Sequence, residues 1–569
     1  MKFSSTIARL ANISFVFPLL IFCLFLGYFA ADVPQGDDFE LILHFLTNYV
    51  STQSLGEKLS LLTAQFVEHR LFYTRFVVLL QYLVSGQVSF YWIIILGNLS
   101  LLGILVICWR QLKLANYSAI YLLPVSIILF QPCYSYDGVL WPAATLAYNS
   151  VSFFAILTIH WLSSRQQKHL WWALGSALMC TYTFGNGILI LGVGACLLIA
   201  QKRWKDLSIW ALGALVIAIV YFTNYTKFEN RNNPFNNITQ HFRYVVTNLL
   251  VFLGSALNWS EEWPKKLTAS DIASILAGGF ILICFGYLVV RLLKSYFKTP
   301  INEKPSNPNR FFDFQIGSLG FFVLTGFLLC LSRVDKDEIL MHINRYRIHS
   351  VAGLVLGYFC LLPFLAKQKL FFRGFVGALG IFWLISFFHF YKIFAEYSRS
   401  YTAAQHNWVS THQWFIYRDT SYWEEASKLA MDKAEKALQY RITKSPFGKV
   451  SEKATVFPHF KMDQSANDKI LKISADVPSL SLKEDYYIAF RNLSQSKTYL
   501  VPAVYNRRSI RLVMMGNDYY YPHFNLELTY RHFPTGKYQV GVGHVVNNAL
   551  AIQWQSAYFD AVQESNLTN

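Results

Sequence analysis

Residues 10–40 read LANISFVFPLLIFCLFLGYFAADVPQGDDFE, an apolar run that ends in an acidic turn. The run reaches the roughly 20 residues that a helix needs to cross a bilayer, and it has no small-residue cleavage site. We therefore expect a retained first span over residues 10–31 rather than a signal peptide. Pro34 and Gly36 predict that the chain bends as it leaves the membrane.

Three acidic side chains stand in or directly after that bend: Asp37, Asp38 and Glu40. A charge that faces lipid is costly, so these carboxylates are expected to face water or a partner. An adjacent pair of carboxylates at a membrane face fits three roles. It can serve as a general base, as a metal ligand, or as the cap of a short helix over residues 39–50.

The composition extends the membrane interpretation to most of the chain. Of 569 residues, 54% are hydrophobic and only 15% are charged, which is too apolar for an ordinary soluble protein. The net charge of +17 comes from Lys and Arg in short clusters between apolar runs. This distribution is typical of the cytoplasmic loops of a polytopic α-helical membrane protein, and it argues against a nucleic-acid partner.

The apolar runs predict about eleven transmembrane helices. Their expected ranges are 10–31, 88–108, 115–131, 148–163, 170–184, 187–200, 207–223, 271–290, 314–332, 349–366 and 374–394. Lys2 and Arg9 predict a cytoplasmic N-terminus, and an odd number of spans then places the C-terminus outside. The apolar pieces at 71–85 and 244–257 are expected not to cross, because crossing by both would invert the loops against the charge rule.

The last part of the chain has the character of a soluble, extracytoplasmic domain. An amphipathic helix is expected over 422–440. Short β-type runs separated by turn signals follow it, at 469–475, 486–491, 498–505, 510–515, 526–530, 537–546 and 549–559. We therefore predict two domains: a transmembrane domain over 1–395, with a first outer loop at 32–70, and a C-terminal domain over 396–569 that holds a helix and a small β-sandwich.

The unusual polar side chains collect on the outer face of this topology. They are Asp37, Asp38, Glu40, Glu68, His69, Arg70, Arg75, Asp137, Asn186, Arg333, Arg345 and Arg347. A site with both carboxylates and guanidiniums suits a substrate with a phosphate leaving group and a hydroxyl acceptor. A carboxylate would take the proton of the acceptor, and arginine would bind the phosphate oxygens.

Three short motifs at these positions resemble those of a known family: Asp37-Asp38-Phe39 after the first span, Glu68-His69-Arg70 before the next apolar piece, and Phe184-Gly185-Asn186-Gly187. With the span architecture of residues 1–395, they are similar to the GT-C glycosyltransferases, and most locally to bacterial members of that family. The resemblance implies an enzyme of the bacterial inner membrane that transfers a sugar from a polyprenyl-phosphate carrier to a glycan or lipid acceptor.

The resemblance also implies roles for individual residues. Asp37 or Asp38 would be the catalytic base, or in some members would bind a divalent cation. Arg70, Arg75, Arg345 and Arg347 would contact phosphate. The second outer loop offers only Asp137, where metal-dependent relatives have a pair of acids, so we assign no metal site and no cofactor.

Several of these residues also have simpler interpretations. Glu68, His69 and Arg70 fit the polar rim of an interfacial helix. Asp137 beside Gly138, and Asn186 between two glycines, both fit tight turns.

The arginines differ in how readily they are explained. Arg345 and Arg347 fit cations that reach lipid head groups, although outer arginines oppose the usual charge bias. Arg75 lies inside an apolar piece, where a guanidinium needs an anionic partner.

Two other functions fit part of the pattern. A transporter or flippase of a lipid-linked substrate predicts ionisable residues near the middle of the spans, or paired broken helices, and the spans are nearly free of charge. An O-antigen polymerase or ligase also needs outer arginines, but it does not need Asp37 and Asp38 after the first span. A scaffold that displays the C-terminal domain would not need so many spans.

Overall fold

A computed structural model of the chain describes residues 13–226, 234–259, 268–298, 309–333, 344–416, 424–453, 457, 459–465, 470–477, 484–530 and 533–561. The chain forms two compact units, the first made of residues 1–30 and 52–391 and the second of residues 31–51 and 392–569. The expected boundary at residue 395 is close to the observed one. The first outer loop, however, is divided, because residues 31–51 belong to the second unit.

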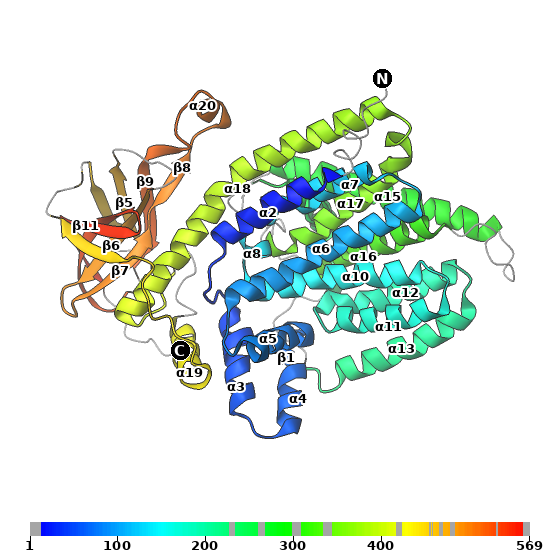
Figure 1. The fold of residues 1–569 in the computed structure, drawn as a ribbon, viewed down its shortest axis with the longest axis horizontal. Coiled ribbons are helices and arrows are strands. Elements are labelled where there is room, and N and C mark those ends of the chain that lie inside the picture. The colour runs from blue at the N-terminus through cyan, green and yellow to red at the C-terminus, as the bar shows by residue number, and fades with distance from the viewer. Residues whose placement is uncertain are drawn as a thin grey trace. The chain divides into compact units, whose positions relative to one another are not determined.

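The first unit is helical (Figure 1). Its main helices are α2 Val16–Phe29, α4 Leu55–Thr63, α5 Phe72–Ser85, α6 Phe90–Leu114, α7 Leu122–Leu129, α8 Ser135–Val139, α10 Ser150–Leu162, α11 Gln167–Thr181, α12 Leu189–Ala200, α13 Trp204–Phe222, α14 Pro234–Gly254, α15 Ala269–Lys298, α16 Arg310–Arg333, α17 Arg347–Leu365 and α18 Lys369–Thr411. Helix α18 continues into the second unit.

Eight stretches of helix in the described chain are long and apolar enough to cross a membrane, and three shorter apolar helices accompany them. A helix lies in each of the eleven ranges expected to span. The structure therefore agrees with a polytopic helical membrane protein, while the number eleven stays a prediction. The same holds for whether α5 and α14, which cover the two short apolar pieces, cross the membrane.

The helices of the first unit have two chemically different ends. Helices α6 and α10 run side by side in the same direction, because Ser100 Oγ lies 2.8 Å from Ser150 Oγ and Gln111 Nε2 lies 2.9 Å from His160 Nδ1. We call the end where α6, α10 and α12 finish and α16 begins the basic end. The opposite end, with the connections 64–71, 130–149, 182–188 and 344–347, is called the mixed end.

The second unit contains two antiparallel-rich sheets. Their strands are β3 Lys449–Lys453, β4 Lys461–Ser465, β5 Ile470–Asp476, β6 Asp485–Asn492, β7 Lys497–Pro502, β8 Val504–Arg507, β9 Tyr520–Thr529, β10 Gly536–Val546 and β11 Ala549–Ala561. The strand orders are β3-β11-β10-β6-β7 and β4-β5-β9-β8. Ring contacts such as Tyr530–Phe559, at 5.7 Å, join the two sheets, as a sandwich requires.

Both faces of strand β6 are covered. Alternate residues of a strand point to opposite faces, and Tyr487 and Ala489 pack with Ala403 of α18 in one buried cluster. On the other face, the backbone N–H of Tyr486 donates to Tyr505 Oη in β8 of the second sheet, at 2.6 Å. The β-sheet unit is therefore built from a helix, a five-stranded sheet and a four-stranded sheet in layers.

Two details of the expected strands are wrong. Residues 510–515 form a short helix, α20 Ile510–Met514, because Ser509 accepts the N–H of Leu512 at its start. The single strand expected over 498–505 is two strands that belong to different sheets, β7 and β8. Strands β3 and β4 were not expected, since both are polar. The helix expected over 422–440 is present as α19 Glu424–Leu438.

Candidate functional site

The acidic turn opens the second unit. A π-helix over Phe39–His44 and helix α3, Phe45–Ser51, follow it. The Asp38 side chain is fully buried, and its Oδ2 accepts the N–H of Gln35 at 2.9 Å. A carboxylate that accepts the N–H three residues earlier closes the turn in the manner of a capping box. Asp38 thus holds the bend before the helix, and no side-chain bond from Asp38 caps the helix that follows.

Asp37 and Glu40 differ from Asp38 in exposure. Asp37 is half-buried, and its carbonyl oxygen accepts the N–H of Leu41 at 2.8 Å. The Glu40 side chain is 53% exposed and lies 3.8 Å from His44 Nε2. Glu40 is therefore a surface residue, whereas Asp37 combines partial burial with access.

The rest of the second unit supports this turn. Phe39 packs edge-on against Trp414, with ring centroids 5.9 Å apart. Helix α19 contacts both the π-helix and α3. The segment that carries the acidic pair is therefore a packed part of the C-terminal unit rather than an independent loop.

His69 lies at the mixed end of the first unit. It belongs to a tight hairpin in which β1, Gln65–Phe66, pairs with β2, His69–Arg70. Its ring centroid lies 4.1 Å from that of Phe184. A Cβ on Gly185 would overlap His69 Nδ1, so only glycine lets the 184–187 turn approach this closely.

Asn186 is buried in the same turn. Its Nδ2 donates to Thr325 Oγ1 of α16 at 3.2 Å. Within the described part of the chain, Asn186 Oδ1 has no hydrogen-bond partner. A buried amide oxygen without a partner is costly, and a ligand donor would offset that cost.

Aromatic rings link this turn to two other connections. The Tyr148 ring lies 4.6 Å from Phe184 and 5.0 Å from Tyr346. Tyr148 belongs to a π-helix, Thr145–Asn149, a conformation that is frequent at functional sites. Tyr346 belongs to a 3₁₀ turn, Asn344–Tyr346, directly before α17.

Two arginines flank Tyr346. The Arg345 guanidinium lies 5.6 Å from the Trp141 ring and 5.8 Å from the Tyr346 ring. Arg347 is 1% exposed, and its Nη1 donates to the Cys133 carbonyl oxygen at 2.6 Å. Asp137 lies in α8, which packs against the Asn344–Tyr346 turn that leads into Arg347. Two cations and one carboxylate therefore meet at the mixed end.

Strain and unmet hydrogen bonds mark the same region. Ser135 has a backbone φ of 58°, which is uncommon for a residue other than glycine and costs energy. Over the residues that the structure describes, the buried Ser135 Oγ, Arg347 Nε and Trp141 Nε1 lack hydrogen-bond partners. Native proteins rarely leave such groups unmet without a reason. These three atoms are available to form hydrogen bonds with a polar, anionic ligand at the mixed end.

Arg70 and Arg75 have structural contacts instead. Arg70 donates through Nε to the Tyr221 carbonyl at 2.6 Å and through Nη1 to the Thr63 carbonyl at 2.8 Å. Arg75 Nη1 donates to the Leu61 carbonyl at 3.0 Å. These oxygens lie at the C-terminal ends of α4 and α13, which favour positive charge. Both arginines therefore stabilise helix ends, and their expected phosphate role stays a prediction.

Glu68 contributes its backbone, since its carbonyl accepts the Tyr225 hydroxyl at 3.2 Å. Of the expected site residues at the mixed end, His69, Asp137, Asn186, Arg345 and Arg347 thus remain as candidates for binding a ligand. Sequence reasoning did not assign Tyr148, Phe184, Tyr346 or Ser135 to a site. Aromatic residues in loops between spans could have indicated the site from the sequence. The unusual backbone conformation of Ser135 could not be predicted from its residue type.

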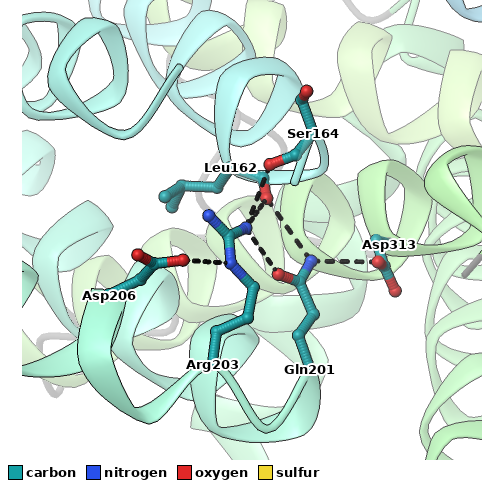
Figure 2. A network of polar contacts seen from close by, with 6 residues as sticks. All are labelled: Leu162, Ser164, Gln201, Arg203, Asp206 and Asp313. Atoms are coloured by element: carbon teal, nitrogen blue, oxygen red, sulfur yellow. Dashed lines mark hydrogen bonds and ion pairs between the residues drawn. The ribbon is translucent and has the colours of Figure 1, made fainter. Parts of the chain in front are cut away.

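The basic end has a different architecture, centred on Arg203 (Figure 2). Arg203 Nε donates to Asp206 Oδ2 at 2.6 Å, and Nη1 donates to the Leu162 carbonyl at 2.8 Å and to Gln201 Oε1 at 2.9 Å. Gln201 Nε2 in turn donates to Asp313 Oδ2 at 2.9 Å. The network ties the ends of α10, α12, α13 and α16 together.

Among the described residues, no group of three or more His, Cys, Asp or Glu side chains is placed to hold a metal ion. No protein-family model matches the chain, and neither a curated protein nor a solved structure matches it. A functional assignment therefore rests on the chemistry of the residues described above.

Proposed function

We propose that this protein is a membrane glycosyltransferase of the GT-C type. It transfers a sugar from a polyprenyl-phosphate carrier to a glycan or lipid acceptor at the outer face of a bacterial inner membrane. The observation that carries the proposal is the convergence of His69, Asn186, Arg345 and Arg347 at the mixed end. These residues come from three separate connections. His69 packs on Phe184 and Arg345 on Tyr346, and the Tyr148 ring contacts both of these rings. Asn186 and Arg347 are close neighbours of Phe184 and Tyr346 in the chain.

The chemistry of this cluster matches a sugar phosphate. Guanidinium groups bind phosphate oxygens with charge-assisted hydrogen bonds, and flat rings offer apolar faces to a sugar. Amide and imidazole groups such as those of Asn186 and His69 suit sugar hydroxyls. An apolar lining with a few convergent polar groups is the usual composition of a small-molecule site.

The transfer step divides between the two kinds of side chain. Arg345 and Arg347 bind the donor phosphate and stabilise its charge as the bond from sugar to phosphate breaks. A carboxylate takes the proton of the acceptor hydroxyl, whose oxygen forms the new bond to the sugar, and the likeness of Asp37-Asp38-Phe39 to the acidic motif of the family makes Asp37 the candidate for this base. The carrier leaves as polyprenyl phosphate. Asp38, which accepts the N–H of Gln35, positions the turn that carries Asp37.

The acidic turn separates this proposal from the alternatives. A flippase or an O-antigen polymerase does not need a carboxylate base at Asp37. The buried ionisable groups Asp313 and His160 lie at the basic end and are hydrogen-bonded to Gln201 and Gln111, rather than along a central path. This arrangement supports an enzyme over a transporter.

The test is sugar transfer by the purified full-length protein from a panel of labelled polyprenyl-phosphate sugars. Asp37→Asn is expected to lower the rate by about 100-fold or more, the scale of a lost general base. Glu40→Gln is the matched control, because it removes an exposed carboxylate from the same segment and should leave the rate unchanged. Equal turnover by Asp37→Asn and wild type would contradict the proposal. Movement of the donor across vesicles without sugar release would favour the flippase.

A further inference from the structure

Strands β8 and β9 of the second unit lead into a narrow arm that carries helix α20 at its tip (Figure 1). The N–H of Arg508 donates to the Tyr519 carbonyl at 2.8 Å and closes the base of this arm. At the start of α20, the Ser509 side chain accepts the N–H of Leu512. Residues 508–519, which we call the α20 arm, are therefore held in place by hydrogen bonds of their own.

The tip of the α20 arm exposes large apolar side chains. Met514 is 82% exposed, Met515 is 68% exposed and Ile510 is 42% exposed. Ile510 and Met514 are four residues apart, so they lie on the same side of α20. No residue of α20 is buried. A group of exposed apolar side chains on an ordered element indicates a surface that binds a partner or a membrane.

Helix α18 shows toward which end of the second unit the arm points. Asn407 of α18 is hydrogen-bonded to the N–H and the carbonyl of Leu500 in β7, at 2.7 and 2.9 Å. About two turns earlier in α18, the Arg399 guanidinium lies 4.4 Å from the Tyr505 ring in β8. The chain from Leu500 to Tyr505 therefore runs toward the N-terminal end of this part of α18, and the α20 arm follows directly after it.

That end of α18 is where the last span is expected to finish. Helix α18 is long and apolar enough to cross a membrane, and its span is predicted over 374–394. Residue 394 lies about 7.5 Å from Arg399 along the helix axis. The five residues from Tyr505 to Ile510 can extend over about 16 Å. The tip of the arm is therefore able to reach the level at which α18 enters the bilayer.

The charge of the α20 arm also suits a phospholipid surface. The arm contains two arginines and one acidic residue, Asp518. Arg508 is used within the arm, because its Nε donates to the Tyr520 carbonyl at 3.1 Å. Arg511 lies in α20 directly after Ile510, and its side chain is exposed. An exposed arginine next to exposed apolar side chains is typical of a helix that lies in the membrane interface.

We propose that the α20 arm is a membrane anchor of the C-terminal domain. Ile510, Met514 and Met515 enter the boundary between head groups and acyl chains beside α18, and Arg511 binds head-group phosphates. The domain is then attached to the bilayer at two places, α18 and the arm, which restricts its rotation about α18. This anchor does not depend on the proposed transferase activity.

The test measures the membrane depth of the arm in the full-length protein, reconstituted in phosphatidylglycerol nanodiscs. A fluorophore is attached at Met514→Cys, on a background in which the exposed Cys23 and Cys196 are serine. Leu493→Cys is the matched control. Leu493 is also an exposed apolar residue, but it directly follows the end of β6, whereas Arg399 contacts the start of β6 at Asp485.

The label at residue 514 should lose about half or more of its fluorescence to lipids with a nitroxide near the top of the acyl chain, because interfacial side chains lie at that depth. The label at residue 493 should respond to iodide in the water and not to the nitroxide lipid. The proposal is overturned if iodide quenches the label at 514 as strongly as the label at 493. It is also overturned if neither quencher reaches residue 514, since a protein surface, such as a second copy of the chain, then covers the arm.

The role of charge is tested on the same labelled protein. Arg511→Gln should lower the ratio of inserted to withdrawn arm about fivefold in phosphatidylglycerol nanodiscs, the effect of one cation at an anionic surface. Lys537→Gln is the control, because the exposed Lys537 accepts the N–H of Leu493 through its carbonyl and so lies at the far end of the domain. Equal quenching at residue 514 in the two variants would contradict the binding of head groups by Arg511.

Discussion

The two ends of the helical unit both hold arginines, but they use them in different ways. At the basic end, Arg203 is bonded to a carboxylate, an amide and two backbone carbonyls. At the mixed end, Arg345 lies against the rings of Trp141 and Tyr346, and Arg347 donates to the Cys133 carbonyl. Arg347 Nε, like Arg203 Nη2, has no hydrogen-bond partner among the described residues. The difference teaches that an arginine with bonds to a carboxylate, an amide and backbone carbonyls stabilises the fold, whereas an arginine held against aromatic rings, as Arg345 is, suits a ligand.

The largest expected effect tests the structural half of this comparison. Arg203→Gln should lower the free energy of unfolding by about 3–5 kcal/mol, because it leaves buried partners of a 5% exposed side chain uncompensated. Thermal unfolding of the purified protein in detergent measures it. Arg243→Gln, an exposed arginine of α14, is the control and should change stability by less than about 0.5 kcal/mol. Equal melting temperatures for the two variants would contradict a structural role of Arg203.

A pair of glycines tests how closely the mixed end is packed. Gly185→Ala should destabilise the protein by about 1–3 kcal/mol, because its Cβ overlaps the His69 ring. Gly175→Ala has open space in the middle of α11 and should stabilise by about 0.5–1 kcal/mol. The melting temperatures should therefore move in opposite directions. A shift in the same direction for both would mean that the 184–187 turn does not press against His69.

The same contrast between bonded and exposed charge occurs in the second unit. Asp38→Asn should cost about 1–3 kcal/mol, because the buried carboxylate accepts the Gln35 N–H in the turn. Glu40→Gln should cost about 0–1 kcal/mol, since the exposed pair with His44 contributes little. Unfolding in denaturant compares the two variants. A loss in Glu40→Gln as large as that in Asp38→Asn would contradict the assignment of Asp38 as the buried support of the turn.

The positions of helices and strands could be predicted from the sequence better than the roles of individual charged residues. Apolar runs long enough to span were readable because membrane helices need continuous hydrophobicity, and each expected range holds a helix. Polar edge strands such as β3 and β4 carry no hydrophobic alternation, so they were missed. The helix at 510–514 was read as a strand because a short apolar run is ambiguous, although Ser509 and Gly516 mark its ends.

The site was predicted in part for a physical reason. His69, Asn186, Arg345 and Arg347 meet because the connections that carry them lie at the same end of neighbouring helices, which alternation of spans predicts. Whether an arginine side chain binds backbone carbonyls elsewhere in the chain depends on tertiary contacts between residues far apart in the sequence. Arg70, for example, binds the carbonyl of Tyr221. Residue type alone could not separate it from Arg345.

The most direct test of the central claim is donor binding at the mixed end. Arg345→Gln and Arg243→Gln remove the same charge, the first beside Trp141 and Tyr346 and the second from an exposed helix surface. Equilibrium binding of a labelled polyprenyl-phosphate sugar to the purified proteins compares them. We expect Arg345→Gln to bind at least about tenfold more weakly than wild type, the scale of a charge-assisted hydrogen bond, with an unchanged melting temperature. Equal affinities for wild type, Arg345→Gln and Arg243→Gln would contradict the account.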